Sequence, residues 1–93
     1  MALEFEWDRR KATSNRRKHG VDFEEAMSVF GDPLALTIAD PLHSDTEDRF
    51  VTIGESHRRG LLVVVFTDRD ERIRIISARK ATRSERKNYE ESE

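Results

Sequence analysis

The chain has 93 residues, a net charge of −2 and no cysteine, so it forms neither disulfides nor thiolate metal sites. This length supports one small domain, and we expect residues 1–93 to form it, ending in a short acidic tail at 90–93. Because no N-terminal apolar run resembles a secretion signal and the longest apolar run, Leu61–Phe66, cannot span a bilayer, we expect a cytoplasmic protein without membrane contact.

The small net charge hides a segregation of charge along the chain. Residues 8–19 and 58–88 are strongly basic, whereas residues 22–56 are strongly acidic. Two basic blocks bind one anionic ligand if the fold brings them together. Charge alone also fits two solvated faces, so this pattern leaves both interpretations open.

The N-terminal third predicts two helices. Phe5–Trp7 is either a short strand or a lead-in to the first helix, which Asp8 caps and which runs to about Lys18 before Gly20 ends it. Asp22 and Glu25 have the spacing of a capping box for the second helix. Its core-facing positions are Phe23, Ala26, Met27 and Phe30, and Gly31 and Pro33 end it.

The middle of the chain predicts four strands joined by short turns, with Thr82 and Glu85 forming a capping box for a last helix. The short connections favour an antiparallel meander. We therefore expect an α+β fold with two N-terminal helices, a four-stranded antiparallel sheet and a C-terminal helix. The strands are expected around 34–38, at 49–53, at 61–66 as the central strand, and at 72–78 after a turn at 68–70; residues 40–48 form an acidic loop.

The most informative segment is 72–89, which carries seven basic side chains on a strand followed by a helix. Guanidinium groups bind phosphate through two parallel hydrogen bonds, and the N-terminus of a helix attracts anions. This pattern predicts a phosphate site in which Arg83, Arg86 and Tyr89 share a helical stripe, with Arg79 and Lys80 at the end of the strand. The alternative is an exposed helix held by pairs such as Arg86 with Glu90.

Lys18 and His19 form a second candidate group at the end of the first helix. Histidine exchanges protons near neutral pH, and lysine binds phosphate as a point charge. A structural role for His19, capping the helix and packing on Trp7, is the alternative. The 40–48 loop contains carboxylates and His43, but its spacing matches no metal-ligand motif, and a solvated loop is the favoured interpretation. We expect no metal and no cofactor.

Eleven segments carry a resemblance to a known family over about residues 5–89. Taken in order, the set resembles the BrnT family of bacterial type II toxins. The segments are Phe5–Asp8, Lys11–Ala12, Asn15, Lys18–Val21, Phe23–Ala26, Val29–Pro33, Arg49–Gly54, Leu61–Val65, Arg74–Thr82, Glu85–Arg86 and Tyr89.

The resemblance implies a RelE-like fold and an endoribonuclease that cuts RNA without metal, using the substrate's own 2′-hydroxyl as nucleophile. It also implies neutralisation by a BrnA-like ribbon-helix-helix antitoxin, through which alone operator DNA is bound, in a complex that can contain several copies. The competing hypothesis is a catalytically inactive homologue that only binds nucleic acid or the antitoxin.

The same resemblance suggests roles for single residues. Arg79 and Arg83 would contact the scissile phosphate, and His19 or Tyr89 would transfer the proton. The RNA-binding candidates are Lys18, Arg49, Lys80 and Arg86, with Lys18 also lowering the charge barrier to substrate approach.

Overall fold

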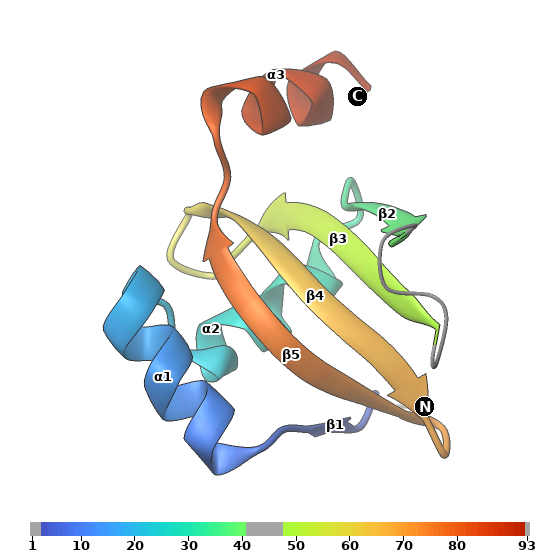
Figure 1. Cartoon of the computed structure of the whole chain (residues 1–93). Helices are drawn as coiled ribbons and strands as arrows, with labels where there is room; N and C mark the ends of the chain where they lie inside the picture. The colour runs from blue at the N-terminus through green and yellow to red at the C-terminus, as the bar shows by residue number, and fades with distance from the viewer. Residues whose placement is uncertain (1–2, 41–47, 93) are drawn as a thin grey trace.

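A computed structural model describes residues 3–40 and 48–92, which form a sheet of five strands with three α-helices around it (Figure 1). Most of the predicted acidic loop, residues 41–47, lies outside the described residues. The strands are β1 Phe5–Glu6, β2 Leu36–Ala39, β3 Arg49–Glu55, β4 Leu61–Arg69 and β5 Arg72–Lys80; the helices are α1 Arg9–His19, α2 Phe23–Ser28 and α3 Arg83–Glu91, with a 3₁₀ turn η1 at Val29–Gly31.

The sheet differs from the prediction because it is mixed. Its strand order is β1-β5-β4-β3-β2, so β4 is central as expected, but β1 adds a fifth strand parallel to β5. Only two residues of β1 pair with β5, too few for the sequence to show a strand period. Long-range contacts hold it: the Ile73 N–H donates to the Glu4 carbonyl at 2.8 Å, Arg74 contacts the Glu6 carboxylate at 2.8 Å, and Phe5 packs edge-to-face on Phe30.

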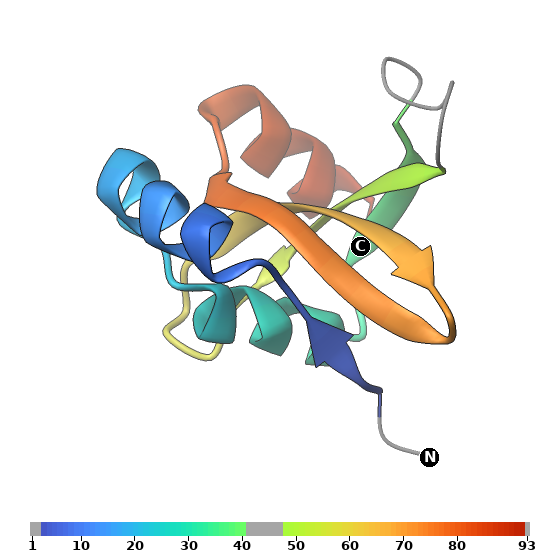
Figure 2. The ribbon, with the colours of Figure 1, turned by 60° about the horizontal axis from the view of Figure 1, so that its bottom comes forward.

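The core lies between the sheet and the N-terminal helices. Side chains of α2 and η1 pack on one face of the sheet, and α3 lies on the other (Figure 2). Gly54 is needed where β3 passes η1, because a Cβ there would lie 2.7 Å from Val29 Cγ1. The buried apolar cluster comprises Val21, Phe23, Ala26, Val29, Leu62, Val64, Phe66, Ile73, Ile75 and Ala78.

The first helix has the predicted limits and is anchored by one buried amide. Asp8 caps it by accepting from the backbone N–H groups of Arg10 and Lys11, and Gly20 ends it with φ of 71°. Asn15, 6% exposed, donates to the Ala78 carbonyl at 2.8 Å and accepts from the Ala78 N–H at 3.0 Å. Its amide thus pairs with the β5 edge as a neighbouring strand would. A third bond, to the Val21 carbonyl, ties in the turn after α1.

The second helix is shorter than predicted and lacks its predicted capping box. Asp22 occupies the N-cap position without a side-chain cap bond and instead pairs with Arg16 at 3.4 Å. The Glu25 carboxylate is buried and accepts from the Ser56 hydroxyl at 2.7 Å, so it cannot reach back to Asp22. A tertiary hydrogen bond has replaced the local one, and the helix continues only as the 3₁₀ turn η1.

The β4–β5 hairpin contains two features that the sequence did not predict. Its turn consists of Asp70 and Glu71, both with positive φ, one position later than expected. Further along, Val65 pairs with Ser77 and Phe66 with Ile75, which leaves Ile76 without a partner on β4. This β-bulge locally increases strand twist, and such bulges often lie next to functional sites.

The last helix begins as predicted but docks differently. Thr82 and Glu85 form the full capping box. Arg83 and Arg86 are exposed, whereas Tyr89 is 6% exposed, so the predicted common stripe does not exist. Residues three and six apart on a helix drift round its axis, which is why Tyr89 turns inward. The helix runs to Glu91, so the predicted acidic tail begins as helix.

We predict that Asn15→Ala lowers the free energy of unfolding by about 2–3 kcal/mol, because it leaves the buried polar groups of Ala78 and the Val21 carbonyl without partners. Urea denaturation measures the change. Ser14→Ala, on the exposed neighbouring position, should change stability by less than about 0.5 kcal/mol. Equal stability of Asn15→Ala and the parent would show that water replaces the amide.

Candidate functional site

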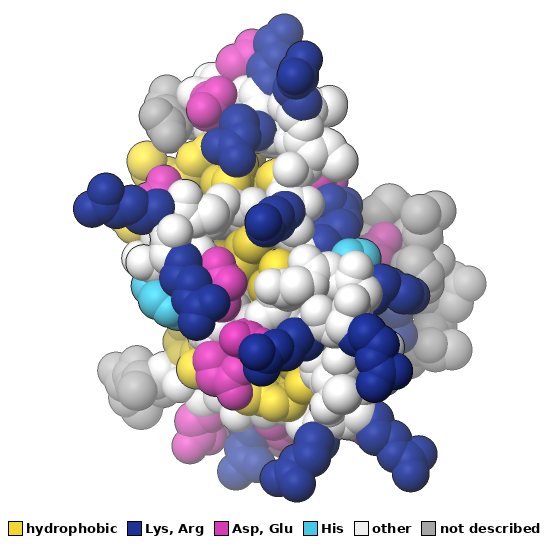
Figure 3. Space-filling view, turned by 90° about the vertical axis from the view of Figure 1, so that its left-hand side faces the viewer, with side chains coloured by type: hydrophobic (Ala, Val, Ile, Leu, Met, Phe, Trp, Pro, Cys, Tyr) yellow, Lys and Arg dark blue, Asp and Glu magenta, His cyan; other side chains and the backbone are white. Residues whose placement is uncertain are grey.

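The described cations fall into two groups that differ in their ionic partners. Arginines at the β5 edge are paired: Arg72 and Arg74 with Glu4 and Glu6, and Arg79 with Glu85. Within residues 3–40 and 48–92, most cations of α1 and α3 form no ion pair with a described carboxylate. Figure 3 shows Lys and Arg side chains spread over the face that runs from α3 to α1. Those without a described ion pair are Arg9, Arg10, Lys11, Arg17, Lys18, Arg83, Arg86 and Lys87.

Arg79 lies where β5 leads into α3 and is held by a carboxylate that sequence reasoning missed as its partner. Its two terminal nitrogens donate to the two Glu85 oxygens at 2.8 and 2.9 Å. The Arg79 hydrogen bonds, against the opposing effect of burial, lower the pKa of Glu85 from its ordinary 4.5 to about 2, and the pair raises the pKa of Arg79. Glu85 thus occupies the position in which a phosphate would meet this guanidinium.

The neighbouring cations of the predicted phosphate site remain exposed. Arg83 is the first residue of α3, two positions before Glu85, and Arg86 follows on the next turn. Lys80 is the exposed last residue of β5, and its carbonyl accepts from Arg79 at 3.3 Å. The structure therefore brings Arg79, Lys80 and Arg83 together at the β5–α3 junction.

Lys18 and His19 lie on the other side of β5, in a cleft between α1 and β5. The cleft encloses about 250 Å³ and is lined by Lys11, Ser14, Asn15, Lys18, His19, Ile76 and Ser77. Asn15 places it next to Arg79, because its amide binds Ala78, the residue that precedes Arg79. The exposed cations of α1 and the arginine at the end of β5 therefore flank the same stretch of strand.

Two predicted site residues lie elsewhere. Arg49 begins β3 opposite Thr67, whereas Arg79 is opposite Val63, four residues further along β4. That separation is about 13 Å along the strand alone. Tyr89 is buried at the opposite end of α3 from Arg83, and its hydroxyl donates to Asp32 Oδ2 at 2.5 Å.

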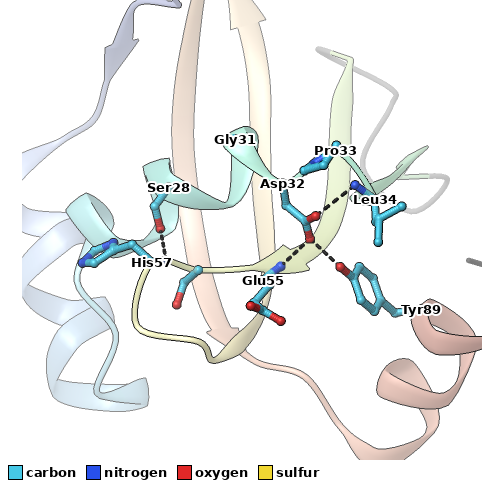
Figure 4. Close-up of a pocket in the computed structure, with 9 residues that line it drawn as sticks. Ser28, Gly31, Asp32, Pro33, Leu34, Glu55, His57 and Tyr89 are labelled. Atoms are coloured by element: carbon cyan, nitrogen blue, oxygen red, sulfur yellow. Dashed lines mark hydrogen bonds between the residues drawn. The ribbon is translucent and has the colours of Figure 1, made fainter.

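Tyr89 belongs to a second cavity of about 400 Å³ between α3, η1 and the end of β3 (Figure 4). The Asp32 carboxylate accepts from the Leu34 N–H, the Glu55 N–H and the Tyr89 hydroxyl. Burial alone would raise the pKa of Asp32, but these three hydrogen bonds together lower it. Two carboxylates, of Asp32 and Glu55, line this cavity, so its electrostatics oppose the binding of a phosphate.

Sequence reasoning missed four residues that shape these sites. Lys11 and Ser77 line the α1–β5 cleft, Asn15 fixes it, and Asp32 anchors Tyr89. Asn15 is a polar residue at a buried position of a polar helix, which a helical projection alone could not distinguish from its neighbours. Among the described residues, no three His, Asp or Glu side chains gather as metal ligands would, and no helix is long and apolar enough to cross a bilayer.

An α+β fold with an exposed basic face beside its last strand is typical of small proteins that act on nucleic acid. Comparison with known proteins narrows this class. A family model described as "Ribonuclease toxin, BrnT, of type II toxin-antitoxin system" matches residues 7–85, and the chain therefore belongs to the BrnT family. Membership of a type II toxin–antitoxin family implies an antitoxin partner.

A solved structure is also similar. It is the 1.1 Å crystal structure of the Brucella abortus ribonuclease toxin BrnT, which is 26% identical, with a TM-score of 0.60. The match covers 88% of this chain and 100% of that one. No curated protein matches this sequence. The family resemblance stated from the sequence is thereby confirmed.

We predict that Glu85→Gln removes a pH-dependent part of the stability. Because the folded-state pKa of Glu85 is depressed to about 2, the Arg79 pair stabilises the fold above the ordinary pKa of 4.5, and this stabilisation is lost as pH falls through about 2. Glutamine keeps the capping box. Unfolding free energies of parent and variant should agree near pH 2 and differ by roughly 1 kcal/mol above pH ~5, since the pair is partly solvated.

The control for this prediction is Glu90→Gln, an exposed glutamate of the same helix. It changes the net charge equally but breaks no described ion pair, so its difference from the parent should stay small at every pH. A Glu85→Gln curve that runs parallel to the parent from pH 2 to 6 would contradict the assigned pair.

Proposed function

We propose that this chain is a cytoplasmic endoribonuclease toxin that cleaves RNA without a metal ion and thereby inhibits translation and growth. The substrate's 2′-hydroxyl oxygen attacks the adjacent phosphorus, the bond from phosphorus to the 5′-oxygen breaks, and the products carry a 2′,3′-cyclic phosphate and a 5′-hydroxyl. The match to the BrnT family model is the observation that supports ribonuclease activity. A BrnA-like ribbon-helix-helix antitoxin neutralises the toxin, and operator DNA is bound only through that antitoxin.

The placement of cations around the end of β5 supports this assignment. Arg79 and Arg83 belong to the β5–α3 junction, and Lys18 and His19 lie in the cleft between α1 and β5. Arginines beside the phosphate stabilise the charge that develops on its oxygens in the transition state. His19 exchanges the proton with the reacting oxygens, because it lies in the cleft beside Lys18 while the Tyr89 hydroxyl is held by Asp32.

The Arg79–Glu85 pair adds a requirement to this mechanism. A phosphate that approaches Arg79 at its two terminal nitrogens would compete with Glu85, since each of these nitrogens already donates to one Glu85 oxygen. Arg83, which forms no ion pair with a described residue, can make the first contact with the substrate. A protein that only binds nucleic acid or the antitoxin would not cleave RNA, and cleavage assays distinguish it from an enzyme.

We predict that Arg79→Ala and Arg83→Ala each reduce RNA cleavage by at least about 10²-fold in buffer with EDTA, because each removes charge stabilisation from the transition state. Gel analysis of a defined RNA measures the rate, and 2′-deoxy substitution at the cut site should abolish the reaction. Arg79→Lys tests the fork geometry, since lysine keeps the charge but not the bidentate contact.

Lys87→Ala is the matched control, an exposed cation on α3 beyond the proposed phosphate site. Its cleavage rate should stay within about threefold of the parent. Folding of each variant is checked by circular dichroism. Unchanged cleavage by a folded Arg83→Ala would remove Arg83 from the mechanism. A folded parent that neither cleaves RNA nor arrests growth when expressed alone would leave the binding-only alternative.

We further predict that Tyr89→Phe retains cleavage to within about tenfold but lowers the free energy of unfolding by about 1–2 kcal/mol, because the Asp32 carboxylate loses a hydrogen bond. Asp32→Asn should destabilise the chain to a similar degree. Loss of cleavage in Tyr89→Phe without loss of stability would instead return Tyr89 to the list of groups that transfer the proton.

A further inference from the structure

The cleft between α1 and β5 has the composition of an anion site. Of its seven lining residues, two are lysines, one is a histidine and two are serines, while none is acidic. The lysines form no ion pair with a described carboxylate, and neither Ser14 nor Ser77 makes a described side-chain hydrogen bond. The carboxylate of Asp8, the N-cap of α1, accepts from the backbone N–H groups of Arg10 and Lys11.

The second cavity gives an internal comparison. It is larger, about 400 Å³ against about 250 Å³, but Asp32 and Glu55 line it and Asp32 already accepts from backbone N–H groups. Of these two cavities, the α1–β5 cleft is the one whose described lining contains lysines without a described ion pair and no carboxylate. A phosphate would meet the ammonium groups of Lys11 and Lys18 and the hydroxyl of Ser77 there.

The cleft lies close to Arg79 along β5. Ser77 and Arg79 are opposite Val65 and Val63 on β4, so they lie on the same face of the sheet two residues apart. That spacing is about 6.6 Å along the strand, so one extended ligand can reach both positions. The bulge at Ile76 places an apolar side chain in the cleft, against which the sugar or base of the same nucleotide can pack.

We propose that the α1–β5 cleft is a second phosphate subsite for single-stranded RNA, formed by Lys11, Lys18 and Ser77, which holds the nucleotide next to the one bound at Arg79 and Arg83. The proposal rests on the proposed function in taking RNA as the ligand. Neither Lys11 nor Ser77 belongs to the phosphate site at the β5–α3 junction, so the two subsites are separable by mutation.

The test measures equilibrium binding of a single-stranded 2′-O-methyl oligoribonucleotide, which keeps its phosphates but cannot be cleaved through a 2′-hydroxyl. Fluorescence anisotropy is recorded at several salt concentrations. Lys11→Ala and Lys18→Ala should each weaken binding about threefold to tenfold and reduce the slope of log K against log salt by about 0.7, as expected for one phosphate contact to a single strand. Ser77→Ala should weaken binding about threefold without changing the slope.

Arg9→Ala is the matched control. Arg9 is an exposed cation of the same helix that does not line the cleft, so its removal changes the net charge as much as Lys11→Ala does. In Arg9→Ala, the slope of log K against log salt should change by less than half as much as in Lys11→Ala. Equal losses in Arg9→Ala and in the two lysine variants would mean that RNA responds to the overall charge of α1, which would overturn the subsite.

Failure of the subsite and failure of the ribonuclease assignment give different results. If the parent cleaves RNA, while Lys11→Ala, Lys18→Ala and Ser77→Ala bind the oligonucleotide as the parent does, the subsite is overturned and the activity stands. If the parent does not cleave RNA but binds the oligonucleotide with the expected losses in the variants, the subsite stands and the enzyme assignment falls. A parent that does not bind the oligonucleotide overturns the subsite directly.

Discussion

The amide of Asn15 is the contact on which the arrangement of the functional face depends. Its donor and its acceptor both bind Ala78, so α1 lies against the edge of β5 where β1 no longer pairs with it. Apolar packing alone would not fix this helix, because Asn15 is its only buried residue. A bond to Val21 joins the same amide to the turn that carries His19. One side chain therefore sets the width of the cleft and its distance from Arg79.

Glu85 makes two contacts that the proposed mechanism affects differently. Its carboxylate accepts from the Thr82 N–H in the capping box and from both terminal nitrogens of Arg79. The first contact starts α3, and the second fixes α3 relative to β5. An incoming phosphate competes only for the second, because the cap contact can persist when Arg79 turns away. The helix α3 can thus remain folded while Arg79 exchanges Glu85 for a phosphate.

Local rules predicted most of the elements but little of their contacts. Asp8 and Gly20 bound α1, and the Thr82–Glu85 spacing starts α3, because these signals act within a few residues. Parallel pairing of β1, the bulge at Ile76 and the Tyr89–Asp32 bond all join distant segments. The same limit explains the failed capping box of α2, where Glu25 has a better partner in Ser56. The family resemblance suggested Arg79 and Arg83 as site residues, whereas only the fold placed Lys11 and Ser77 in one cleft.

The described cations fall into two groups, and the proposed RNA binding draws on only one of them. Arginines of the β5 edge are neutralised by Glu4, Glu6 and Glu85 and hold the scaffold together. Cations of α1 and α3 remain without described acidic partners, so binding depends on two helices that pack few apolar side chains. Each is held instead by a polar anchor, Asn15 for α1 and Tyr89 for α3. Breaking either hydrogen bond would leave buried polar groups without partners, which is costly. These bonds therefore fix the two helices in position, so the helix surfaces can carry cations in place of a broad apolar face.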